Sequence, residues 1–236
     1  LDYCALAPGR KARIVRAHRT TAQLDVPDGV VVEFSYGFTN TTTGSLQKAF
    51  NGDMISLGNG SRLIRPLLYG NGATYTGRGI VVASGGDQVL EDPIIMDMNG
   101  PCLEFPNDGG GVRFKALNGL YRRTTTTNYA IVGPATESTT SGYRLFLNPQ
   151  AGGGALFQFK NGNMWQIFGG TGAGYDFGST TTGRVIAIGH RFASDVLVFG
   201  TEHHISNCSI GGVFTLGSGA TYCDISGNTI ASDATV

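Results

Sequence analysis

One short unit recurs along this chain: an apolar run, a turn built from Gly, Asn, Ser or Asp, and a second apolar run. Residues 54–65 and 80–91 each show this order, and the unit returns near residues 102–114, 155–168 and 185–199. The clearest copy lies near the end, where Ile205–Ile210 is echoed by Ile225–Ile230, 20 residues later. Elsewhere the spacing runs from roughly 22 to 30 residues, which is typical of one coil of a solenoid with loops of varying length.

Strands this short are not stable alone, but each can pair with the equivalent strand of the next coil. Alternate side chains of a strand point to opposite faces, so a stack of coils forms apolar ladders inside and polar ladders outside. The repeat therefore predicts an all-β parallel solenoid of roughly seven to nine coils. A β-sandwich is less consistent with it, since a sandwich needs hairpins with two-residue turns. We expect six apolar side chains to be buried: Val82, Leu103, Phe157, Ile186, Ile205 and Ile225.

Composition agrees with this fold and excludes several functions. Glycine accounts for 37 of the 236 residues and charged residues for only 14%, a balance that favours tight turns over long helices. The one helical turn that the sequence suggests is Ser45–Phe50. The formal net charge is zero, so there is no basic footprint for nucleic acid. A neutral surface rich in hydroxyl and amide groups suits a glycan better.

The four cysteines form no Cys-x-x-Cys pair, and no metal site or cofactor is indicated. Three of them lie in apolar stretches and are expected to be buried thiols: Cys102, Cys208 and Cys223. Free thiols favour assembly in a reducing cytoplasm. No apolar run is long enough to cross a membrane, and no export signal is visible. Because the chain does not begin with Met and stops just after a strand pattern, we expect it to be a fragment of a larger chain.

The N-terminal part carries a recognisable pattern. The segment Leu24–Phe34, with Pro27 and Gly29 between apolar positions, resembles the opening segment of pectate-lyase-like β-helices, and the Ile-x-x-Asn-x-Ile units near the end resemble later coils of that superfamily. The resemblance implies a right-handed parallel β-helix, with residues 1–50 as the N-terminal coil and residues 51–236 as the remaining coils. It is a signature of fold that pectinases, epimerases and phage tailspikes share, so it specifies function only weakly.

Among these groups the chain is most similar to bacteriophage tailspikes. It shows no export signal, no disulfide pattern and no cluster of calcium-binding aspartates, and its Thr-rich stretches at residues 39–43, 124–127 and 180–182 resemble those of viral fibres. The resemblance implies a homotrimer in the phage tail that is made in the host cytoplasm, then binds and cleaves a bacterial surface polysaccharide such as O-antigen or capsule. The alternatives are a non-catalytic receptor-binding or structural fibre segment, and a secreted polysaccharide lyase or epimerase.

Cleavage by hydrolysis would need two carboxyl groups, about 5–5.5 Å apart for retention or 6.5–9.5 Å for inversion. Adjacent coils lie roughly 4.8 Å apart, so carboxyls one or two coils apart meet either requirement. We select Asp195 and Glu202, which flank the apolar run Val196–Phe199, and His203 as a proton-sharing partner. Only one of His203 and His204 can share a face with a given partner.

Sugar binding would need amides and exposed aromatic rings. Gln166 is taken to occupy the position of Asp195 one coil earlier, if residues 186–188 align with residues 157–159. Trp165, the sole tryptophan, is equally consistent with a sugar platform, the core or a subunit interface. Tyr143 and Tyr175 lie in longer loops and are better placed to be exposed, so the predicted binding residues are Trp165, Gln166, Tyr143 and Tyr175.

Overall fold

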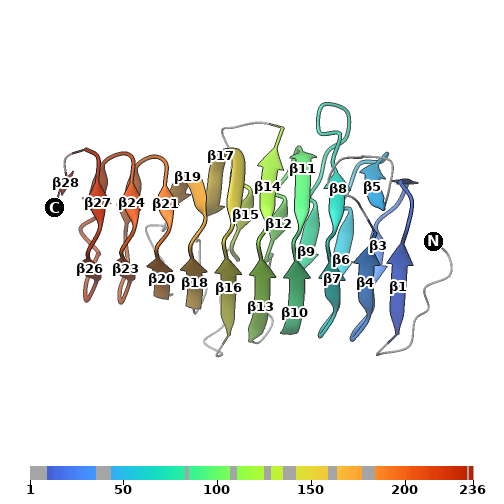
Figure 1. Cartoon of the computed structure of the whole chain (residues 1–236), viewed down its shortest axis with the longest axis horizontal. Helices are drawn as coiled ribbons and strands as arrows, with labels where there is room; N and C mark the ends of the chain where they lie inside the picture. Colours follow the sequence, from blue (N-terminus) through green and yellow to red (C-terminus); the bar gives the residue numbers. More distant parts are fainter. Residues whose placement is uncertain are drawn as a thin grey trace.

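The chain forms a right-handed parallel β-helix, as the repeat predicted (Figure 1). This computed structural model describes residues 10–35, 44–82, 85–106, 111–124, 129–134, 142–158, 164–176, 184–232 and 234–235, with backbone alone at 153–156, 173–176 and 234–235. Every pair of neighbouring strands in the described ranges is parallel, and none of the described residues is helical.

The strands stack into three faces. The first face, the lower row of arrows in Figure 1, is a ten-stranded sheet. A second sheet of 18 strands bends around one corner and supplies the other two faces. Its strands β17 and β19 run around the bend, since Gln150 pairs with Leu120 on the second face while Phe157 pairs with Ile131 on the third. The described ranges therefore contain ten coils, more than the seven to nine expected.

The first face contains β1 (Lys11–Ile14), β4 (Val31–Phe34), β7 (Arg62–Ile64), β10 (Gly86–Glu91), β13 (Val112–Leu117), β16 (Tyr143–Leu147), β18 (Met164–Phe168), β20 (Arg184–Ile188), β23 (His204–Ser206) and β26 (Asp224–Ser226). The second face contains β2 (His18–Thr20), β5 (Ser45–Lys48), β8 (Leu67–Tyr69), β11 (Ile94–Met98), β14 (Leu120–Arg123), β21 (Arg191–Phe192), β24 (Ser209–Ile210) and β27 (Thr229–Ile230). The third contains β3 (Leu24–Val26), β6 (Ile55–Leu57), β9 (Ile80–Val82), β12 (Leu103–Glu104), β15 (Ile131–Val132), β22 (Val196–Val198), β25 (Phe214–Leu216) and β28 (Ala234–Thr235). The strands that serve both of these faces are β17 (Gln150–Gln158) and β19 (Thr171–Asp176).

Apolar ladders fill the bore. On the first face one inward column runs without a break through all ten strands. Stacking the same position of successive coils excludes water along the whole length, so each short strand gains a core that it could not form alone. The members of this column are Ala12, Val32, Leu63, Leu90, Ala116, Phe146, Ile167, Ala187, Ile205 and Ile225.

The middle of the bore holds an aromatic cluster. Trp165 is fully buried, with its ring centroid 6.0 Å from that of Phe146, nearly parallel to it, and 5.7 Å from that of Phe105, at right angles. The guanidinium carbon of the buried Arg144 lies 5.1 Å from the Phe105 ring and 5.1 Å from the Trp165 ring. Such a cation over aromatic faces is favourable when water is excluded. Phe114 and Phe157 complete the cluster.

The corner between the first and second faces is the most regular turn of the molecule. In eight successive coils the residue at this corner has a positive φ, between 47° and 65°. Gly, Asn and Asp adopt this left-handed conformation at least cost, and they hold seven of the eight positions. The side chain of Asn148 donates to Asn118, and that of Asn118 donates to Asp92, so polar side chains stack as well. We call this series the corner ladder: Arg65, Asp92, Asn118, Asn148, Gly169, Gly189, Asn207 and Gly227.

Several expectations about single residues need correction. Ile186 faces outward and is half-buried, because the buried residues of β20 are its neighbours Val185 and Ala187. Ile225 is only partly buried, since it lies on the last strand of the first face. Residues 45–48 form strand β5 and not a helical turn. The expected burial of Val82, Leu103, Phe157 and Ile205 is confirmed. Among the cysteines, Cys102 and Cys208 are buried free thiols, whereas Cys223 is half-buried.

Candidate functional site

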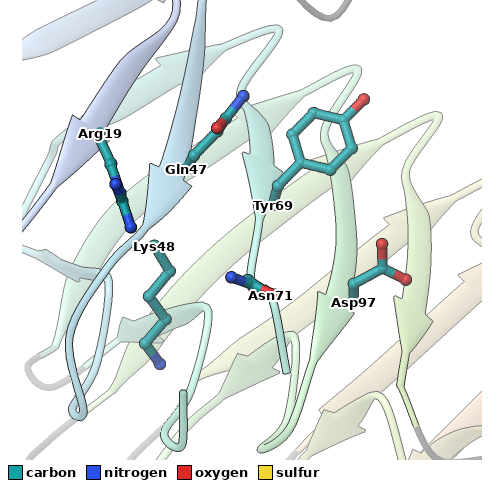
Figure 2. Close-up of a pocket in the computed structure, with 6 residues that line it drawn as sticks. All are labelled: Arg19, Gln47, Lys48, Tyr69, Asn71 and Asp97. Atoms are coloured by element: carbon teal, nitrogen blue, oxygen red, sulfur yellow. The ribbon is translucent and has the colours of Figure 1, made fainter. Parts of the chain in front are cut away.

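A polar groove of about 450 Å³ crosses the first four coils on the second face (Figure 2). Three of its side chains form an outward column, because Arg19 pairs with Gln47 and Gln47 pairs with Tyr69 on the next strand. Figure 2 shows Asp97 beyond Tyr69, with Lys48 and Asn71 beside this row. We call this site the flank groove and define it by Arg19, Gln47, Lys48, Tyr69, Asn71 and Asp97.

An irregularity in β11 creates the far wall of the groove. The register between β11 and β14 shifts between Ile95 and Met98, as in a β-bulge, and Asp97 adopts a φ of 56°. The bulge turns the Asp97 carboxylate toward Arg122, whose Nη2 donates to it at 2.9 Å. One wall of the groove is thus a carboxylate that is already paired with a cation.

Two glycines let the neighbouring loop pack against this bulge. The backbone N–H of Gly70 donates to Met96 and that of Gly72 to Asp97, so the loop that carries Asn71 is hydrogen-bonded on both sides. A Cβ on Gly72 would lie 2.6 Å from the Asp97 carbonyl oxygen, and one on Gly70 would lie 2.5 Å from it. Only residues without a side chain permit this approach, so the glycines fix the position of Asn71.

Lys48 forms part of the groove floor. Its residue is 2% exposed, and its Nζ donates to the Thr76 carbonyl at 2.6 Å. Burial lowers the pKa of Lys48, and the nearby Asp53 opposes that effect. Asp53 itself is held by Arg78, which donates from Nε and Nη2 to its two oxygens and lowers its pKa. Lys48 is therefore a fixed donor and not a mobile surface cation.

Tyr69 supplies the aromatic surface of the groove. It is half-buried on β8, and burial followed by the charge of Asp97 raises its pKa, so the phenol stays protonated. A protonated phenol can donate one hydrogen bond while its ring offers an apolar face. The groove thus combines hydrogen-bond donors, acceptors and one ring on strands of fixed register.

The three predicted catalytic residues do not converge. Asp195 directly precedes the three-residue strand β22, whereas Glu202 lies four residues beyond its end and shortly before β23, so the two are roughly 10 Å or more apart along the backbone. The Asp195 carboxylate accepts a hydrogen bond from the Val213 backbone N–H at 2.8 Å, and Glu202 forms an ion pair with Arg184. Each carboxylate therefore already has a bonding partner. These contacts account for its position at a corner without a catalytic role.

His203 is a structural residue. It is 1% exposed, its Nδ1 accepts from the Val185 backbone N–H at 3.1 Å, and its Nε2 donates to the Phe199 carbonyl at 2.7 Å. These two bonds fix the neutral tautomer, and burial lowers the pKa of His203. The expectation that His203 and His204 face opposite ways is confirmed, and it is His204 that points outward.

The predicted sugar-binding residues are also dispersed. Trp165 is in the core and cannot stack on a sugar. Gln166 faces outward on the first face, but it pairs with Ile186 and not with a residue near Asp195, so the alignment behind that expectation was wrong. Tyr143 is half-buried on the first face, where the Lys115 ammonium lies 5.9 Å from its ring centroid. The side chain of Tyr175 lies outside the described residues.

Sequence reasoning missed the flank groove because its residues come from four coils with long loops between them. Two local signals were present: the Gly70-Asn71-Gly72 turn after an apolar strand, and an aspartate inside the apolar run 94–98. Within the described ranges no group of His, Cys, Asp and Glu has the arrangement of a metal site. No described segment is a helix that could span a membrane.

Comparison with known proteins gives no identification. No known protein family matches the sequence, and no curated protein is significantly similar to it. Function must therefore be argued from the fold and from the groove.

Proposed function

We propose that this chain is a segment of a bacteriophage tailspike or tail fibre, and that its flank groove binds a bacterial surface polysaccharide. The observation that carries the proposal is the composition of the groove, where amides, cations and a carboxylate surround one tyrosine ring. The parallel β-helix fold and the formal net charge of zero support the same proposal.

The groove suits a glycan for specific chemical reasons. Sugar hydroxyls both donate and accept hydrogen bonds, and the amides of Gln47 and Asn71 can do the same. The C–H face of a sugar ring is apolar and packs on an aromatic face such as that of Tyr69. Four strands at a spacing of roughly 4.8 Å give the groove a length of about 14 Å, which accommodates more than one sugar ring.

Binding is better supported than cleavage. Glycoside hydrolysis needs two carboxyl groups, and the described groove offers Asp97 alone, which is already paired with Arg122. A lyase needs a positioned group that accepts a proton, whereas the Tyr69 phenol stays protonated and the Lys48 ammonium is bonded to the Thr76 carbonyl and almost fully buried. We therefore propose receptor binding as the activity of this segment.

The test is direct binding of the purified chain to lipopolysaccharides and capsules extracted from a panel of bacterial strains. Tyr69→Ala and Asn71→Gly should each weaken binding to the recognised polymer at least tenfold, because they remove the ring and an amide, and glycine keeps the φ of 49° at residue 71 without strain. Unchanged affinity in both variants would contradict the groove as the binding site. The polymer should keep its length during incubation, and a shortened product on size-exclusion chromatography would argue for cleavage.

Matched controls come from the first face. Tyr143→Ala removes a tyrosine of similar exposure, and Arg113→Ala removes a surface cation that is paired with Asp87. Both variants should bind like the unmodified chain. A loss of binding in Tyr143→Ala alone would move the site to the first face.

We also propose that the chain assembles as a homotrimer. Leu197 and Tyr222 are exposed large hydrophobic residues in the last coils, with 40% and 88% of their surface accessible, and only 14% of the chain is charged. Burying such side chains between copies is favourable. Light scattering should give three times the chain mass of 24.8 kDa, and a monomer mass for the complete gene product would contradict this.

A further inference from the structure

A serine, a histidine and an aspartate meet on the outer side of the first face in the last two coils. His204 Nδ1 lies 2.8 Å from Asp224 Oδ2, and His204 Nε2 lies 3.0 Å from the Ser206 hydroxyl oxygen. No local sequence pattern indicates this group, because Asp224 lies one coil beyond the other two residues. We infer that Ser206, His204 and Asp224 form a nucleophilic triad that hydrolyses esters.

The β-helix itself assembles the three residues. His204 and Ser206 are two positions apart on β23, so both point outward. Asp224 is the register partner of His204 on β26, so its side chain lies on the same surface, one strand away. Rigid strands, and not loops, therefore hold the geometry, which is what a preorganised site requires.

Each contact has a chemical role. Asp224 accepts a hydrogen bond from the Nδ1–H of His204 and thereby fixes the tautomer whose Nε2 carries a lone pair. That lone pair accepts the proton of the Ser206 hydroxyl, which makes the oxygen nucleophilic. His204 and Asp224 keep 38% and 58% of their side-chain surface exposed, so a ligand can reach the group, while Ser206 at 6% exposure lies on its floor.

The surroundings indicate the class of ester. Ile188 is the register partner of Ser206 and Ile186 is the partner of His204, and both isoleucines face outward and are half-buried. A short apolar acyl chain can pack on these two side chains while its carbonyl carbon lies over Ser206. We therefore assign esters of short aliphatic acids as the substrate class.

The reaction balances without any cofactor. The Ser206 oxygen bonds to the carbonyl carbon and its proton passes to His204 Nε2. The bond from that carbon to the alkoxy oxygen then breaks, and the alcohol leaves with the proton. Water then attacks the acyl carbon and gives a proton to His204 Nε2, the bond from that carbon to the Ser206 oxygen breaks, and the carboxylic acid leaves while the Ser206 oxygen takes the proton from His204.

Turnover should be slow. The backbone N–H groups that follow Ser206 are already used, because Asn207 donates to Ser226 and Cys208 donates to the Asn228 side chain. They cannot stabilise the oxyanion, a contribution that is commonly worth a hundredfold or more in rate. An activated ester, whose leaving group departs easily, acylates Ser206 faster than water removes the acyl group, so we expect a burst of product followed by a slow steady rate with such a substrate.

The test uses the full chain with p-nitrophenyl butyrate and a fluorophosphonate probe, followed by peptide mass spectrometry. The probe should label Ser206 and one p-nitrophenol per chain should be released in the burst. Ser206→Ala should abolish both signals, and His204→Gln and Asp224→Asn should each slow labelling at least about a hundredfold, the scale of lost general-base catalysis. Labelling that is absent in the unmodified chain, or equally fast in His204→Gln, would overturn the triad.

Two further variants serve as controls. Ser226→Ala removes the exposed serine that pairs with Ser206 on the next strand and should leave labelling unchanged. Ile188→Asn should lower the rate with butyrate more than the rate with acetate, and an unchanged ratio would overturn the assigned substrate class. Unaltered melting temperatures would show that all variants fold. Because the flank groove lies on another face in the first four coils, failure of either site would leave the other intact.

Discussion

Coils two to five and coils seven to ten both stack their strands around an apolar bore, but their repeats differ in length. In the first group Val31 pairs with Arg62 and Lys115 pairs with Leu145, so the repeats are 31 and 30 residues long. In the second group the repeats are 20, 18 and 20 residues long, as the register partners show: Gln166, Ile186, His204 and Asp224. The longer repeats place a loop and a bulge on the second face and thereby form the flank groove. The shorter repeats leave side chains in strict columns, which is how the triad arises.

The junction of these two regions should be the most sensitive point of the fold. Trp165, in coil seven, packs there against Phe105 from coil four and against Phe146 and Phe157 from coil six. Trp165→Ala should lower the free energy of unfolding by about 3–5 kcal/mol, the usual cost of a large core aromatic. Urea denaturation measures it, with Val15→Ala as a control, since Val15 is 51% exposed and its truncation should change stability by less than about 0.5 kcal/mol. Equal effects would show that the cluster does not couple the regions.

Glycines should matter more in the groove region than in the regular region. Gly72→Ala places a Cβ against the backbone of the bulge, and we expect a loss of about 1–3 kcal/mol from overpacking, together with weaker glycan binding. Gly219→Ala meets no atom within 4 Å and should be neutral or slightly stabilising. Thermal melts of the two variants give the comparison, and similar losses would contradict it.

Acid should weaken the regular coils through His190. Burial lowers the pKa of His190 from its ordinary 6.5 to about 4, although its hydrogen bond to the Gly169 carbonyl opposes this. The unfolded chain binds the proton first, so this contribution is complete above pH 6.5 and is lost as the pH falls toward 4. Between pH 6.5 and pH 5 the loss should be about 2 kcal/mol. Denaturation at several pH values should show a shallower slope for His190→Gln, and identical slopes would count against this origin.

A substitution in the corner ladder, at the junction of the two regions, should have a smaller effect. Asn148→Ala puts a residue without a polar side chain at a φ of 48° and removes the bond to Asn118, which should cost about 1–2 kcal/mol. Asn148→Gly should restore most of that loss because glycine adopts this conformation freely. Melting temperatures test the pair, and no recovery in the glycine variant would assign the cost to the side-chain bond.

The surface ion pair between Arg184 and Glu202 should have the least effect. Its side chains are 46% and 54% exposed, and exposed pairs contribute about 0–1 kcal/mol. Arg184→Gln should therefore shift the melting temperature only slightly, and less at high salt. A large loss would contradict this and would show that the pair contributes more to stability than exposed pairs usually do.

The sequence predicted the fold because coil spacing and alternation are local properties. It failed at Ile186 because residues 185–188 are all apolar and carry no signal of which face is inward. It could separate His203 from His204 by alternation but could not tell which one pointed out. The groove and the triad depend on register between coils, and register across long loops is fixed only once the whole stack has formed.

The corner ladder has a consequence for how such a chain can change. In eight of the ten coils the chain leaves the first face through a left-handed residue, and in seven of these the backbone N–H of that residue donates to the next coil. One coil can therefore replace another, because the corner residues that connect the coils have the same backbone conformation. Removing residues 166–185 would bring Ile186 to the place of Gln166, its register partner, and leave every remaining connector intact. The molecule can thus be shortened, lengthened or recombined by whole coils, and a groove or a triad travels with the coils that carry it.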